Sequence, residues 1–62
     1  MIKISELTKE RDINRKVIYQ PQSDHNEEGR ITSWNDSFIF VDYSNSGRGI
    51  ATRPEDLNFI SK

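Results

Sequence analysis

"SFIFVDYSNSGRG", residues 37–49, joins the most hydrophobic segment of the chain to a loop of small polar residues that holds two glycines and an arginine. The run from Phe38 to Val41 is too short for a buried helix, and its β-branched and aromatic residues favour a strand. Because its apolar residues do not alternate with polar ones, both faces of this strand are expected to be covered. The segment therefore predicts the central strand of a small β-domain, with the polar loop on its binding surface.

Short strands are expected on both sides of this segment. Together with it they make five, at about residues 15–20, 30–34, 37–43, 50–53 and 57–60. β-Branched and aromatic residues favour the first strand, which Pro21 ends because it has no N–H to donate to a neighbour. Asn35 and Asp36 predict a tight turn between the second and third strands. Pro54, followed by two acidic residues, indicates a single helical turn before the last strand.

Residues 1–14 are expected to form an arm. Four apolar residues would fold it back onto the core: Ile2, Ile4, Leu7 and Ile13. Thr8 is a suitable N-cap for one helical turn, but apolar residues do not recur at the spacing of a longer helix. The chain is thus expected to be a single all-β domain, residues 1–62. Its expected architecture is a small five-stranded SH3-like barrel with an N-terminal arm and a one-turn helix before the last strand.

Size and composition exclude several classes of protein. With 62 residues and no cysteine, the chain is expected to lack disulfide bonds and any cysteine-based zinc site. Its longest apolar run is far shorter than the roughly 20 residues that cross a bilayer, and no signal peptide is recognisable. We therefore expect a soluble, cytoplasmic protein with no membrane partner. The net charge of −1 gives the chain no general attraction to nucleic acid.

Most of the chain, from Leu7 to Ile60, resembles a family of small phage and prophage proteins with an SH3-like fold. The resemblance lies in "LTKERDINRKVIY", "EEGRITSWNDSFIFVDY" and "ATRPEDLNFI". It implies a phage origin, the cytoplasm of a bacterial host and the barrel fold, and it supplies no catalytic residue and no ligand. This chain departs from the family pattern at Asn14, where glycine is commoner, and in its shorter loop after the third strand.

The stretch "FVDYSN" is also similar to a "DYGN"-like motif of Tudor domains, at Asp42, Tyr43 and Asn45, with Ser44 in place of the glycine. In Tudor domains, aromatic residues enclose a methylated lysine or arginine and an asparagine orients it. The resemblance implies such a cage here only if Tyr43 and Trp34 face one another.

Six residues are candidates for a binding surface: Tyr19, Trp34, Tyr43, Asn45, Arg48 and Arg53. Exposed aromatic rings can hold a cation, a proline-rich peptide or a nucleic-acid base. Arg48 stands between two glycines, whose backbone freedom would bring it close to a phosphate or carboxylate. The alternatives are that Trp34 only caps the barrel and that the arginines, with Arg15, Lys16 and Arg30, are ordinary solubilising charges.

Catalytic and metal chemistry find little support in the sequence. His25 with Asp24, Glu27 and Glu28 is a poor metal site, because it offers one imidazole on a polar loop with nothing to orient it. Nucleophilic catalysis would require a cysteine or a Ser-His-Asp set, and "GRG" is too short for a phosphate-binding loop. We expect a protein that is not an enzyme and holds no cofactor or metal.

The expected function is therefore that of a binding module. A protein partner, from the host or the phage, is the first expectation, with Trp34, Tyr43 and Arg48 as anchors, because aromatic and arginine side chains dominate small interfaces. Interference with a host process is compatible with this role. Nucleic-acid binding is the second hypothesis, and Tudor-like recognition of methylated lysine or arginine is the third. Exposed edge strands would also permit weak homo-oligomers.

Overall fold

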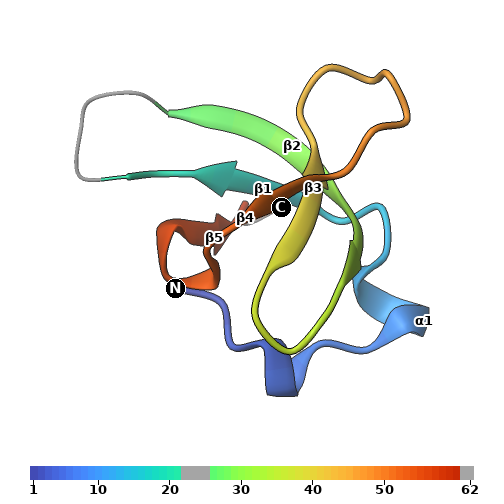
Figure 1. Cartoon of the computed structure of the whole chain (residues 1–62), viewed down its shortest axis with the longest axis vertical. Helices are drawn as coiled ribbons and strands as arrows, with labels where there is room; N and C mark the ends of the chain where they lie inside the picture. Colours follow the sequence, from blue (N-terminus) through green and yellow to red (C-terminus); the bar gives the residue numbers. More distant parts are fainter. Residues whose placement is uncertain (22–25, 61–62) are drawn as a thin grey trace.

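Five antiparallel strands form one curved sheet in the computed structural model, which describes residues 1–21 and 26–60 (Figure 1). The strands are β1 (Lys16–Tyr19), β2 (Glu27–Trp34), β3 (Ile39–Asp42), β4 (Ile50–Thr52) and β5 (Leu57–Phe59). Three helical turns accompany them: η1 (Ile4–Glu6), α1 (Lys9–Asp12) and η2 (Pro54–Asp56). The expected five strands, arm and one-turn helix before the last strand are confirmed.

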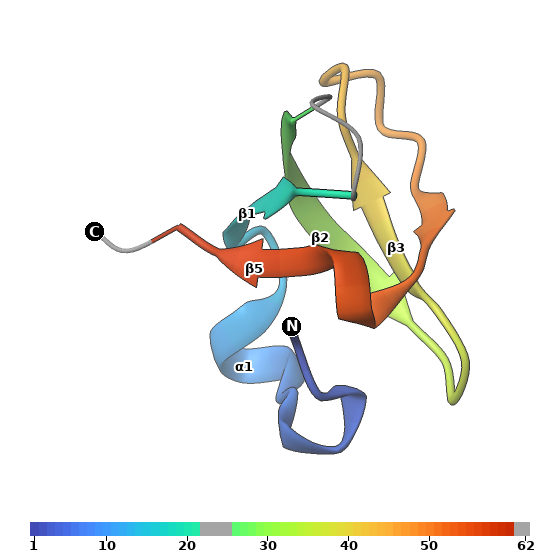
Figure 2. The ribbon, with the colours of Figure 1, turned by 90° about the vertical axis from the view of Figure 1, so that its left-hand side faces the viewer.

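The sheet has the spatial order β4-β3-β2-β1-β5 and is not closed by hydrogen bonds, so β4 and β5 are its edges among the described residues. Figures 1 and 2 show the arm at one end of the sheet and the loop between β3 and β4 at the other. Within residues 1–21 and 26–60, no helix has the length and apolar composition needed to cross a membrane.

The second strand begins earlier than expected. Glu27 and Glu28 pair with Tyr19 and Ile18 across the antiparallel β1–β2 ladder, so β2 starts at Glu27 rather than at Arg30. Two glutamates carry no strand signal of their own. They are extended because they pair with β1, whose apolar residues determine the register of the two strands.

The core occupies one face of the sheet. Six apolar side chains are buried there: Ile2, Val17, Ile31, Ile39, Val41 and Leu57. β3 therefore alternates, with Ile39 and Val41 fully buried and Phe40 half-buried on the opposite face. The expectation that the run from Phe38 to Val41 is covered on both faces is wrong at Phe38, which precedes the strand and remains 40% exposed.

The hairpin turn between β2 and β3 depends on Asn35. Its side-chain oxygen accepts hydrogen bonds from the backbone N–H groups of Ser37 at 2.8 Å and Phe38 at 2.7 Å. Its own N–H donates to the Phe38 carbonyl at 2.9 Å. An asparagine that bonds its own backbone in this way closes a turn without glycine, as the sequence predicts.

The arm packs on the sheet through three of its four expected residues, whereas Ile13 is half-buried and does not join the core cluster. Ile2 is buried in the core, Ile4 and Leu7 pack against it, and the Ile2 N–H donates to the Pro54 carbonyl at 3.0 Å. Asn14, with φ at 67°, turns the chain from the arm into β1, in a left-handed conformation that asparagine tolerates.

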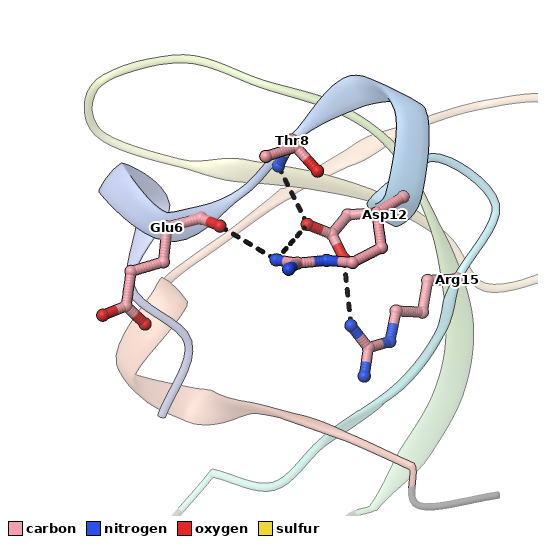
Figure 3. A network of polar contacts seen from close by, with 5 residues as sticks. Glu6, Thr8, Asp12 and Arg15 are labelled. Atoms are coloured by element: carbon pink, nitrogen blue, oxygen red, sulfur yellow. Dashed lines mark hydrogen bonds and ion pairs between the residues drawn. The ribbon is translucent and has the colours of Figure 1, made fainter.

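A buried carboxylate organises the helical turn α1 (Figure 3). Asp12 is fully buried and accepts hydrogen bonds from the Thr8 N–H at 2.9 Å, Arg11 Nη2 at 3.0 Å and Arg15 Nη1 at 3.0 Å. Thr8 forms no side-chain cap, so the helical turn is stabilised by Asp12 instead. The hydrogen bond from Arg11 outweighs the effect of burial and holds the pKa of Asp12 well below its ordinary value, with help from Thr8 and Arg15.

Candidate binding groove

A concavity of about 530 Å³ opens beside the core. We call it the groove. Its lining residues come from β1, β2, β4, η2 and the segments that flank β3: Tyr19, Glu27, Phe38, Tyr43, Ile50, Ala51, Thr52, Arg53 and Asp56. No strand pairs with β4 on the side away from β3 among the described residues, so the groove lies along an edge of the sheet.

Two tyrosines form one end of the groove and rest on the core. The rings of Tyr19 and Tyr43 meet edge to face, with their centres 6.2 Å apart and their planes at 64°. The hydroxyl groups of Tyr43 and the buried Thr52 share a hydrogen bond of 2.8 Å. Burial raises the pKa of the Tyr43 phenol, and the neighbouring Tyr19 and Glu27 raise it further, while the Thr52 bond acts in the opposite direction.

Gly29 makes room for Tyr43. A Cβ at this position would lie 2.6 Å from Val41 Cγ1, 2.8 Å from the Asp42 carbonyl oxygen and 3.0 Å from Tyr43 Cδ1. Only glycine lets β2 approach the end of β3 this closely. The tyrosine ring therefore reaches the groove over a position that has no side chain.

Large apolar side chains are exposed at the groove. Ile50 is 53% exposed and Phe38 is 40% exposed, and both line it. Ile50 pairs with the buried Val41 across the β3–β4 ladder. Because β4 is an edge strand among the described residues, no strand lies on the other side of Ile50. Exposed apolar groups gathered in a concavity are typical of a binding surface.

Three charged side chains of residues 1–21 and 26–60 line the groove: Glu27, Arg53 and Asp56. Across the described residues, ion pairs form only between Asp12 and its two arginines. The carboxylates of Glu27 and Asp56 are thus not neutralised by Arg53.

The structure brings three of the six sequence candidates together, namely Tyr19, Tyr43 and Arg53. Trp34 is half-buried and packs against the core, and Tyr43 pairs with Tyr19 rather than with Trp34. Asn45 lines a separate depression of about 160 Å³, whereas the exposed Arg48 lines neither concavity.

The loop that carries Asn45 and Arg48 is held by Asp42. Its carboxylate accepts hydrogen bonds from the N–H groups of Ser44, Ser46 and Gly47, at 3.2, 3.3 and 3.0 Å. These bonds overcome the effect of burial and lower the pKa of Asp42. Asn45 and Gly47 are left-handed, with φ at 57° and 80°. The hydrogen bonds to the Asp42 carboxylate therefore fix the conformation of the loop.

Arg15, Lys16 and Arg30 also lie outside the groove, and Lys16 and Arg30 line the depression that contains Asn45. Arg15 is engaged with Asp12 and lies over the ring of Phe59, at 3.8 Å from its centre, while Lys16 faces Arg30 across the β1–β2 ladder. Of the suggested metal site, Asp24 and His25 lie outside the described residues. In the described part of the chain, no three histidine, cysteine or acidic side chains are grouped to hold a metal.

Six groove residues were missed from the sequence: Glu27, Phe38, Ile50, Ala51, Thr52 and Asp56. Phe38 directly follows a turn and Ile50 directly follows a glycine, so both stand where a strand is only beginning. That position was the available signal for their exposure. Nothing in the sequence next to Glu27 or Asp56 indicates that they line a groove. Their carboxylates reach it because the strand order β2-β1-β5 brings the two segments together.

Comparisons with models of known protein families, with curated proteins and with solved structures find no match for this chain. The chemistry of the groove is therefore the basis for the functional conclusion.

Proposed function

We propose that this protein is a non-enzymatic binding module that captures an extended segment of a partner protein in the groove. The observation that carries the proposal is the exposure of Phe38 and Ile50 beside the unpaired edge of β4. An extended segment can add to a free sheet edge through its backbone while its side chains enter an adjoining pocket. The paired tyrosines at the end of the groove offer the rigid aromatic surface that such contacts use.

The charges in the groove favour a protein partner over a nucleic acid. Glu27 and Asp56 would repel phosphates, and among the described residues Arg53 is the only basic side chain in the lining. Domains that bind nucleic acid through their backbone phosphates typically present a strongly basic surface.

Selection of peptides from a random displayed library, followed by NMR titration of the ¹⁵N-labelled protein, tests this function. Selected peptides should shift the signals of Tyr19, Tyr43 and Ile50. The variant Ile50→Ser should lose most of the affinity and keep its fold, because Ile50 is already 53% exposed. Arg48→Ser, an exposed change outside the groove, is the matched control and should bind as the unchanged protein does.

Two results would contradict the proposal. One is a failure to select any peptide while oligonucleotides at low salt shift the groove signals. The other is concentration-dependent broadening at Phe38 and Ile50 without peptide, which would identify a second copy of the chain as the occupant.

A further inference from the structure

We infer that the groove accepts a cationic side chain of the captured segment, with arginine preferred to lysine. This inference rests on the proposed function and specifies the chemistry of its ligand. It begins with the charges of the lining in the described part of the chain: two carboxylates, Glu27 and Asp56, against the single guanidinium of Arg53. The groove is thus acidic at neutral pH, and a cation in the partner complements it.

The sheet register brings Glu27 and Asp56 to the two sides of Tyr19. Glu27 is the residue directly opposite Tyr19 on β2, so the two side chains are neighbours on one face of the sheet. On the other side of β1, Tyr19 pairs with Leu57, the residue after Asp56. The backbone carbonyl of Asp56 also accepts the Gln20 N–H at 2.7 Å, which ties η2 to the end of β1. Tyr19 is therefore flanked by an acidic residue on each side.

Aromatic faces and carboxylates together are the surroundings that a guanidinium prefers. A guanidinium over a tyrosine ring is attracted by the negative face of the ring, and nearby carboxylates accept hydrogen bonds from the N–H groups of the guanidinium. The chain uses the same combination internally, where Arg15 lies 3.8 Å from the centre of the Phe59 ring and donates to Asp12 at 3.0 Å. Arginine is preferred to lysine because its planar guanidinium stacks on rings and donates to two acceptors at once.

The apolar lining is continuous with this acidic end. Ile50, Ala51 and Phe38 belong to the same concavity as the two tyrosines. The ligand that fits is an extended segment with an arginine next to an aliphatic residue. Its backbone would lie along β4.

Two capped tripeptides test the inference: acetyl-Val-Arg-Val-amide and the same peptide with citrulline, a neutral isostere of arginine. In NMR titrations the arginine peptide should bind about tenfold more tightly, since it gains both ring and carboxylate contacts. Glu27→Gln and Asp56→Asn should each weaken its binding about threefold. The matched controls are Glu28→Gln and Glu55→Gln, chain neighbours of the two carboxylates that do not line the groove, and they should leave the affinity unchanged.

The outcomes separate this inference from the function on which it rests. Equal binding of the arginine and citrulline peptides in the groove would overturn the preference for a cation. The proposed function as a peptide-binding module would still stand. The preference would also be overturned if library-selected peptides bound the groove without any cationic residue. If neither tripeptide bound and no peptide could be selected, both proposals would fall.

Discussion

The guanidinium of Arg15 lies over the ring of Phe59, with its central carbon 3.8 Å from the ring centre. Because the same guanidinium donates to the buried Asp12, it connects the arm to the last strand of the sheet. The two segments are far apart in the sequence, and this contact adds to the packing of Ile2, Ile4 and Leu7 that holds the arm on the core. A domain of this size has a small core and depends on such additional contacts.

Asp12→Asn should destabilise the protein by about 2 kcal/mol, because the amide leaves two guanidinium groups without their charged acceptor. Urea denaturation at neutral pH, followed by tryptophan fluorescence, measures the free energy of unfolding. The control is Glu10→Gln, an exposed change in the same helical turn, which should alter stability little. Equal stability of Asp12→Asn and the unchanged protein would show that the buried pair contributes nothing net.

Stability should also fall in acid, and Asp12 should account for part of the fall. Its pKa is lower in the folded protein than the ordinary value of 3.8, so its contribution is fully present above that value and is lost as the pH decreases below it. The difference in stability between the unchanged protein and Asp12→Asn should therefore shrink from pH 5 to pH 2. A difference that stays constant over this range would contradict the assignment.

Gly29→Ala should cost about 1–3 kcal/mol, because its Cβ would meet the Asp42 carbonyl and the Val41 side chain and force the strands apart. Tyr43 lies against the same position, so the tyrosine pair should be disturbed and its ring signals should shift in the NMR spectrum. Arg30→Ala, at the next position of β2, is exposed and serves as the control. Unchanged ring signals in a stable Gly29→Ala protein would show that β2 can yield without moving Tyr43.

Local chemistry predicted the elements of this fold well. The β-branched residues of β1 and β3, the side chain of Asn35 and the position of Pro54 each act on their own neighbourhood. For the exposure of Phe38 the only local signal was its position directly after a turn, because the exposure itself depends on which face of the sheet the arm and loops leave uncovered. The groove is a tertiary feature for the same reason. Glu27 and Asp56 come together only once β1 lies between β2 and β5.

Arg53→Gln should strengthen binding of the arginine tripeptide about threefold, because it removes a positive charge from the groove lining that repels the guanidinium of the ligand. Most groove substitutions are expected to weaken binding, so an increase is a demanding result. Arg48→Gln removes the same charge from the loop that follows β3, outside the groove, and should leave the affinity nearly unchanged. If Arg53→Gln instead weakened binding, Arg53 would be donating hydrogen bonds to the carbonyl oxygens of the capped peptide, and the expected repulsion between Arg53 and the ligand would be wrong.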